Sequence, residues 1–191
     1  MIKRILFPLW IGTVFFLIPA VHEVHAAITI TSTSSPSVPS FGIQRFNEKK
    51  AASPFSLKTL NGGQVSLGDF KGKPVMLFFW VTWCESCKDE MPSIEEFAKK
   101  TKELVFLLMA IDGEREARVR KIIKEKKVTL PVLLLAGASG DKLMEEYKVG
   151  GWVPQTYLID QRGTLIGKMV GPRDWSSPEA WSSIKEVFDL H

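Results

Sequence analysis

The stretch that decides the fold reads VMLFFWV at residues 75–81 and continues as TWCESCKDEM at residues 82–91. Seven consecutive apolar residues, mostly aromatic or aliphatic, are typical of a strand that is buried on both faces of a sheet. After Cys84 the pattern changes, because apolar residues from Met91 onward recur at helical spacing with charged residues between them. Pro92 is expected to kink this helix or to begin its second half. The cysteines therefore lie at a strand-to-helix junction.

Strands and helices alternate along the rest of the chain. Residues 55–60 and 64–67 alternate apolar and polar side chains around Asn61-Gly62-Gly63, which predicts an N-terminal β-hairpin. Further strands are expected at 104–111, 130–135, 155–160 and 165–170, and helices at 114–127, 141–147 and from 177 onward. This order predicts an α/β fold, with a central mixed β-sheet and helices on both faces.

The chain contains two cysteines, Cys84 and Cys87. A helix N-terminus stabilises a thiolate, so Cys84 is expected to attack disulfides and Cys87 to resolve the mixed disulfide. A purely structural disulfide across so short a loop would remove little chain entropy. A zinc site would need a second pair of ligands, which the sequence lacks. The pattern therefore favours a redox-active pair.

Residues 79–92, FWVTWCESCKDEMP, resemble the active-site segment of the TlpA/ResA/CcmG branch of the thioredoxin superfamily. VPQTYLID at 153–160 resembles the cis-proline strand of that family, and GPRDW at 171–175 is most similar to its TlpA members. The likeness extends from about Phe55 to the C-terminal helix. It implies a thioredoxin-like fold with an extra helix–strand insertion, for which residues 112–135 are the candidates.

The same resemblance implies what the protein does. Members of this branch are typically exported, and they reduce disulfides of partner proteins such as apocytochromes c and copper-site assembly proteins. A reductant outside the cytoplasm must be recharged, which implies a membrane electron-donor protein. No cofactor and no metal are expected.

The resemblance also assigns candidate site residues. It places Glu90 near the cysteines, where the carboxylate would take or deliver the proton of the Cys87 thiol; an exposed helix glutamate is the alternative. It suggests that Trp83 covers the disulfide and binds partners, although core packing would also explain a tryptophan there. The Val153–Pro154 bond is expected to be cis, which would leave the Val153 backbone free to pair with a substrate strand.

Three residues bear on the direction of electron flow. Phe78 stands where thioredoxin has a buried carboxylate, so that group is missing here. Glu85 and Ser86 separate the cysteines, and neither is a cation that would favour the Cys84 thiolate. Relatives often have proline in place of Ser86. We expect a reductant, with a potential nearer to thioredoxin's value of about −270 mV than to the oxidant extreme of about −120 mV.

The N-terminus predicts export. Two basic residues precede an apolar run at residues 5–21, so residues 1–26 are interpreted as a signal peptide or, alternatively, as an uncleaved membrane anchor. Residues 27–50 are expected to form a flexible linker, and residues 51–191 the thioredoxin-like domain. The protein is then periplasmic or tethered to the extracytoplasmic face of a membrane.

Composition excludes some functions and leaves others open. A net charge of +4 without a dense basic stretch gives nucleic-acid binding little support. After cleavage, His191 would be the only histidine, so a Cys–His nucleophile is excluded. A copper chaperone that binds through its two thiolates stays open as an alternative, as does a thiol oxidase. A peroxidase of the peroxiredoxin type is disfavoured. Its cysteine would follow the pattern Pro-x-x-x-Thr/Ser-x-x-Cys, which the residues FWVTW at 79–83 do not match.

Overall fold

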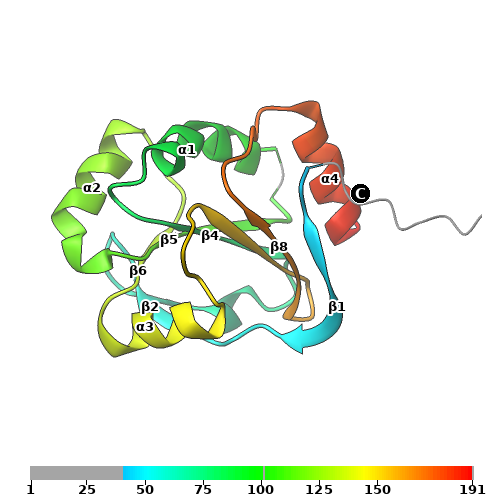
Figure 1. Cartoon of the computed structure of the whole chain (residues 1–191), viewed down its shortest axis with the longest axis horizontal. Helices are drawn as coiled ribbons and strands as arrows, with labels where there is room; N and C mark the ends of the chain where they lie inside the picture. Colours follow the sequence, from blue (N-terminus) through cyan, green and yellow to red (C-terminus); the bar gives the residue numbers. More distant parts are fainter. Residues whose placement is uncertain (1–40, 101, 191) are drawn as a thin grey trace, which may run out of the picture. The chain divides into compact units, whose positions relative to one another are not determined.

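The computed structural model describes residues 41–100 and 102–190 (Figure 1). Its strands are β1 (Gln44–Ala51), β2 (Ser56–Lys58), β3 (Gln64–Ser66), β4 (Val75–Trp80), β5 (Val105–Ala110), β6 (Val132–Leu134), β7 (Gln155–Ile159) and β8 (Thr164–Val170). Its helices are α1 (Glu85–Ala98), α2 (Glu116–Glu125), α3 (Gly137–Glu146) and α4 (Pro178–Phe188), with short 3-10 helices η1 (Leu67–Phe70) and η2 (Gly113–Arg115).

Six strands form one mixed sheet in the order β1-β8-β7-β4-β5-β6. Strands β4, β5 and β6 run parallel, whereas β7 and β8 pair antiparallel with their neighbours. The β2–β3 pair forms the separate hairpin that the sequence predicts. Helices α1, α2 and α4 cover one face of the sheet, and α3 covers the other together with the hairpin (Figure 1). The predicted α/β thioredoxin-like fold is therefore confirmed.

Strand β4 lies at the centre of this arrangement. Phe78 and Trp80 point into the core beneath α1, whereas Leu77 and Phe79 point into the core beneath α3. All six residues of β4 are buried. The uninterrupted apolar run thus follows from covering both faces of the sheet.

The parallel strands place their carboxyl ends at one edge of the sheet. β4 is followed by the loop that carries Cys84, and β5 is followed by Asp112 and the inserted segment α2–β6. Helix α1 starts at the end of that loop and continues through Pro92. The cysteine pair is consequently held between the central strand and a long helix.

A second anchor joins α1 to the insertion. The buried Glu95 carboxylate accepts hydrogen bonds from the Thr129 hydroxyl at 2.5 Å, the Thr129 N–H at 2.9 Å and the Leu130 N–H at 3.2 Å. These three donors precede β6. Glu95 therefore fixes the insertion to the C-terminal half of α1.

The folded domain begins earlier than the sequence suggests. Residues 41–50 were expected to lie in the linker, yet Phe41 and Ile43 are buried and β1 pairs with β8. All side chains of β1 are exposed, so it gives no apolar pattern. The predicted signal peptide and the rest of the linker lie outside the described residues. Among the described helices, none combines the length and apolar character needed to span a bilayer.

Candidate active site

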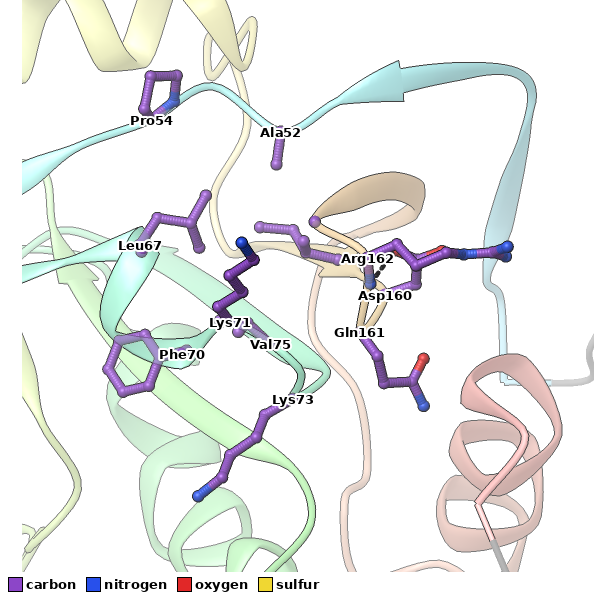
Figure 2. A pocket seen from close by; sticks show the side chains of 13 residues that line it. Ala52, Pro54, Leu67, Phe70, Lys71, Lys73, Val75, Asp160, Gln161 and Arg162 are labelled. Carbon is purple, nitrogen blue, oxygen red and sulfur yellow. Dashed lines mark hydrogen bonds and ion pairs between the residues drawn. The ribbon is translucent and has the colours of Figure 1, made fainter.

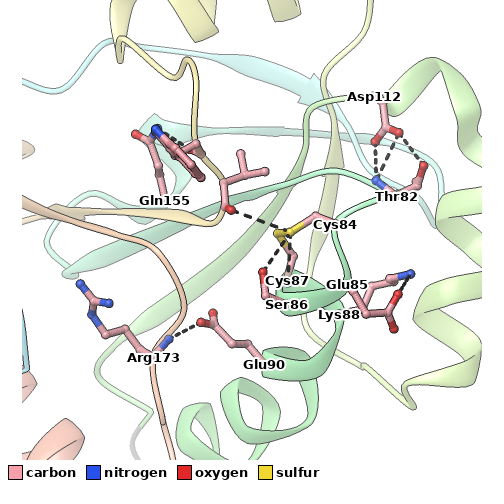
Figure 3. Close-up of a disulfide and its surroundings, with 12 residues drawn as sticks. Thr82, Cys84, Glu85, Ser86, Cys87, Lys88, Glu90, Asp112, Gln155 and Arg173 are labelled. Atoms are coloured by element: carbon pink, nitrogen blue, oxygen red, sulfur yellow. Dashed lines mark hydrogen bonds and ion pairs between the residues drawn. A yellow bond between two sulfur atoms is a disulfide. The ribbon is translucent and has the colours of Figure 1, made fainter.

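Cys84 and Cys87 form a disulfide at the start of α1 (Figure 3). Cys84 is the N-cap residue of the helix, and its Sγ accepts a hydrogen bond from the Cys87 N–H at 3.2 Å. The Ser86 hydroxyl lies 3.5 Å from the same sulfur. Both donors, together with the helix N-terminus, stabilise negative charge on Cys84 after reduction. Cys84 is 7% exposed and Cys87 is fully buried, so an incoming partner reaches Cys84.

The segment before β7 faces the disulfide. The Val153–Pro154 bond is cis, as predicted, and the Val153 carbonyl oxygen lies 3.9 Å from Cys84 Sγ. In the disulfide this sulfur carries no proton, so the approach is a contact rather than a hydrogen bond. Among the described residues, nothing accepts the N–H of Val153. A partly exposed backbone with a free donor therefore lies beside Cys84.

Glu90 lies on α1 one turn beyond the disulfide and is 6% exposed. Its Oε1 accepts a short hydrogen bond from the Arg173 backbone N–H, and Figure 3 shows the carboxylate turned toward that residue. Burial raises the pKa of Glu90 from 4.5 to about 7, although the Arg173 N–H, the Trp175 indole and the Arg173 charge oppose the rise. Glu90 is therefore not an exposed helix glutamate, and it titrates near neutral pH.

Arg173 fixes the segment that covers Glu90. Its guanidinium donates to the backbone carbonyls of Phe41 at 3.1 Å, Val170 at 3.0 Å and Pro172 at 2.8 Å. Gly42 makes room for it, because a Cβ there would lie 2.8 Å from Arg173 Nη2. The Arg173 N–H consequently donates to Glu90 from a loop that the Arg173 guanidinium ties to three backbone carbonyls. GPRDW is recognisable as a motif in the sequence, but the motif does not reveal this contact.

Asp112 is a site residue that sequence reasoning missed. Its buried carboxylate accepts hydrogen bonds from the Thr82 N–H at 3.0 Å and the Thr82 hydroxyl at 2.6 Å, two positions before Cys84 (Figure 3). Because β4 and β5 are parallel, the residues that follow them meet at one edge of the sheet. The signal available in the sequence was an acid directly after the strand expected at residues 104–111. Asp112 holds the loop that presents Cys84.

The charges at the start of α1 largely cancel. Glu85 Oε2 lies 2.6 Å from Lys88 Nζ, so the lysine offsets part of the negative charge beside Cys84. Trp83 is 66% exposed and thus does not pack into the core. Trp83 and Val153 were both predicted to bind partners. Trp83 directly precedes Cys84, and the Val153 carbonyl oxygen lies 3.9 Å from Cys84 Sγ.

The cavity shown in Figure 2 lies elsewhere. It has a volume of about 280 Å³ and is lined mainly by η1, the segment that leads into β4, and the β7–β8 turn. Val75 begins β4 and Cys84 follows its end, so the length of the central strand separates the two sites. The cavity shares no residue with the disulfide site.

Comparisons with known proteins agree with this geometry. The AhpC/TSA family pattern matches residues 49–168. The chain is 37% identical over 123 residues to a thiol-disulfide oxidoreductase ResA of Bacillus cereus, covering 64% of this chain and 69% of ResA. The thioredoxin domain of a thiol-disulfide oxidoreductase from Bacteroides vulgatus superimposes with a TM-score of 0.62 and 27% identity, covering 72% and 94%. StoA from Bacillus subtilis gives a TM-score of 0.57 and 26% identity, covering 69% and 97%.

Proposed function

The chain belongs to the AhpC/TSA family and is a thiol–disulfide oxidoreductase of the ResA/StoA type, and we propose that it is exported and reduces disulfides of partner proteins outside the cytoplasm. One observation carries the proposal most strongly. Cys84 is the more exposed sulfur of a redox disulfide, and it lies 3.9 Å from a backbone segment with a free N–H. That geometry suits a partner strand that pairs with Val153 while its own disulfide approaches Cys84.

The exchange proceeds in two steps from the reduced protein. The Cys84 thiolate attacks one sulfur of the partner disulfide, forming a mixed disulfide and releasing one partner thiolate. Cys87, as a thiolate, then attacks Cys84 Sγ and releases the second partner thiolate. Two electrons pass to the partner, and the Cys84–Cys87 disulfide forms.

Glu90 handles the proton of the buried Cys87 in this proposal. Cys87 has to lose its proton before it attacks, and no solvent reaches it directly. A carboxylate with a pKa of about 7, one turn along the same helix, accepts a proton at neutral pH and gives it back when the protein is reduced again. Pro154 and Trp83 help to bind the partner segment.

The direction of electron flow follows from the charges near Cys84. Glu85, paired with Lys88, adds no net positive charge that would stabilise the thiolate strongly. We propose a potential nearer to about −270 mV than to about −120 mV, with recharging by a membrane electron-donor protein. We further propose that the protein takes part in the maturation of cytochromes c or of copper sites. We also propose that it is more closely related to TlpA members than to the other members of its branch.

A trapping experiment tests the function. Cys87→Ser, expressed as the full chain in its native compartment, should accumulate mixed disulfides that reducing agents release, because resolution is blocked. Cys84→Ser is the matched control and should trap none. Partners trapped by Cys84→Ser but not by Cys87→Ser would reverse the assigned roles. Equilibration of the wild type with glutathione buffers tests the direction, and a potential near the oxidant extreme would instead indicate a thiol oxidase.

A further inference from the structure

Among the described residues, three large hydrophobic side chains are markedly exposed: Phe46 at 36%, Trp83 at 66% and Trp152 at 78%. Exposing an indole to water is unfavourable, and a tryptophan with most of its surface in solvent gains free energy when a partner covers it. Phe46 lies on β1, at the sheet edge away from the cysteines. The two tryptophans both adjoin residues of the disulfide site.

Two separate chain segments bring these tryptophans to Cys84. Trp83 directly precedes Cys84. Trp152 directly precedes Val153, whose carbonyl oxygen lies 3.9 Å from Cys84 Sγ. The two indoles are therefore carried by backbones that meet at the attacking sulfur.

A buried side chain of β7 holds the backbone of Trp152 through a hydrogen bond. The buried Gln155 donates from Nε2 to the Trp152 carbonyl at 2.7 Å and, less closely, to the Gly150 carbonyl at 3.4 Å. Its Oε1 lies 3.0 Å from the Tyr157 hydroxyl, whose single proton is shared with the closer Tyr147 carbonyl oxygen. A glutamine with both ends engaged thus connects the exposed loop to the sheet. Such support makes the loop a preorganised surface, which lowers the cost of binding.

We propose that Trp83 and Trp152 form an aromatic surface that selects partner segments with an apolar or aromatic side chain beside the reacting cysteine, and that Gln155 is a positioning residue for it. The occupant is an extended, cysteine-containing segment of a protein substrate. This inference rests on the proposed function, because only disulfide exchange brings such a segment to Cys84.

Charge gives this surface little other basis for selection. Glu85 and Lys88, at the start of α1, pair with each other at 2.6 Å. A partner side chain that reaches the indoles therefore gains binding free energy from apolar contact. A negative or positive charge on that side chain adds little, because the Glu85–Lys88 pair is close to neutral. Aromatic residues at interface centres commonly supply a large share of binding free energy.

Peptide exchange tests the preference. The reduced full-length protein is mixed with disulfide-linked peptides that carry tryptophan, leucine or serine next to the cysteine, and second-order rate constants are measured by stopped flow. We expect the tryptophan and leucine peptides to react about tenfold faster than the serine peptide, a ratio that corresponds to about 1.4 kcal/mol. Trp152→Ala should reduce this ratio to below about threefold.

Two further variants make the test specific. Phe46→Ala removes an exposed aromatic side chain remote from Cys84, so it should keep the wild-type ratio. Gln155→Ala should lower the ratio of the tryptophan to the serine rate constant, because the Trp152 carbonyl loses its hydrogen bond. A general loss of structure would instead slow all three peptides alike and leave the ratio unchanged. Unfolding temperatures confirm that each variant is folded.

The outcomes separate the two proposals. A wild-type protein that does not reduce even bis(2-hydroxyethyl) disulfide, which has no peptide to recognise, contradicts the proposed function and this inference with it. A wild type that reduces this compound but reacts equally with all three peptides overturns the aromatic surface alone. The aromatic surface is also overturned if Trp152→Ala keeps the wild-type ratio. It is overturned as well if Phe46→Ala lowers the ratio as much as Trp152→Ala does.

Discussion

Two buried glutamates on α1 behave in opposite ways. Glu90 is 6% exposed and Glu95 is 5% exposed, and they lie five positions apart on one helix. Burial raises the pKa of Glu90 to about 7. Burial acts on Glu95 in the same direction, but hydrogen bonds from Thr129 and Leu130 outweigh it and lower its pKa. Burial alone therefore does not decide the charge of an acid in this protein.

The difference lies in the donors that each half of the helix meets. Glu95 faces the insertion and accepts bonds from a hydroxyl and two backbone N–H groups, which together replace much of its lost hydration. Glu90 faces a loop in which the Arg173 N–H donates to it and the Trp175 indole also lowers its pKa, but burial outweighs both. An acid with several donors is a fixed structural anion, whereas an acid with fewer donors can exchange a proton near neutral pH. Only the second kind suits acid–base work beside the cysteines.

The largest expected effect comes from removing the charge of Glu90. Between pH 4.5 and about 7, Glu90 is mostly protonated in the folded protein but mostly ionised in the unfolded chain. The free energy of unfolding therefore falls as pH rises across this range. At about 1.4 kcal/mol for each pH unit, the buried charge costs about 3 kcal/mol above pH 7. Glu90→Gln should therefore stabilise the oxidised protein by up to about 3 kcal/mol at pH 8.5 and by almost nothing at pH 4.

Urea denaturation at the two pH values measures the difference. If Glu90→Gln destabilises the protein at pH 8.5, Glu90 resembles Glu95 and the comparison fails. The same variant should slow the resolution step at pH 7, since the glutamine accepts no proton.

Glu95→Gln should act with the opposite sign. The lowered pKa of Glu95 means that its charge stabilises the fold above pH 4.5 and that this contribution is lost as pH falls through the folded-state pKa. We expect a loss of about 2 kcal/mol at pH 7 that shrinks in acid, because a neutral amide cannot satisfy all three donors equally well. Equal losses at pH 7 and pH 3 would show that packing, rather than charge, explains the effect.

Asp112 extends the comparison to a third acid. It is anchored like Glu95, by the N–H and hydroxyl of Thr82, but the segment it holds carries Cys84. Asp112→Asn should cost about 1 to 2 kcal/mol in stability and should also slow the reaction of Cys84 with a small disulfide. Thr82→Ser, which keeps both donors, is the matched control and should change neither quantity much. A normal rate in Asp112→Asn would limit this residue to a structural role.

The smallest expected effect is the coupling between the two glutamates. They are five positions apart, which is about 7.5 Å along the helix axis, and they share no partner. The double variant Glu90→Gln/Glu95→Gln should show the sum of the single changes to within about 0.5 kcal/mol at each pH. A larger deviation, seen in the same denaturation curves, would mean that the two halves of α1 do not act independently.

Much of the fold was predictable because local patterns and core packing agree. The apolar run before Cys84 predicts a central strand, and β4 is buried on both faces. The Asn61-Gly62-Gly63 turn predicts the hairpin that β2 and β3 form. Strand β1 was missed, because backbone pairing with β8 fixes it while its side chains stay in solvent. A strand without a buried face gives no alternation to detect.

The sequence by itself determined the chemistry: two cysteines at a helix start, and no other thiol in the chain. Only the tertiary structure decided how that chemistry is tuned. Glu90 owes its raised pKa to burial in the folded protein, and Asp112 reaches Thr82 across two parallel strands. The Val153 carbonyl lies beside Cys84 because the segment before β7 returns to the start of α1. Burial, donor geometry and exposure depend on residues far apart in the chain, so no local pattern encodes them.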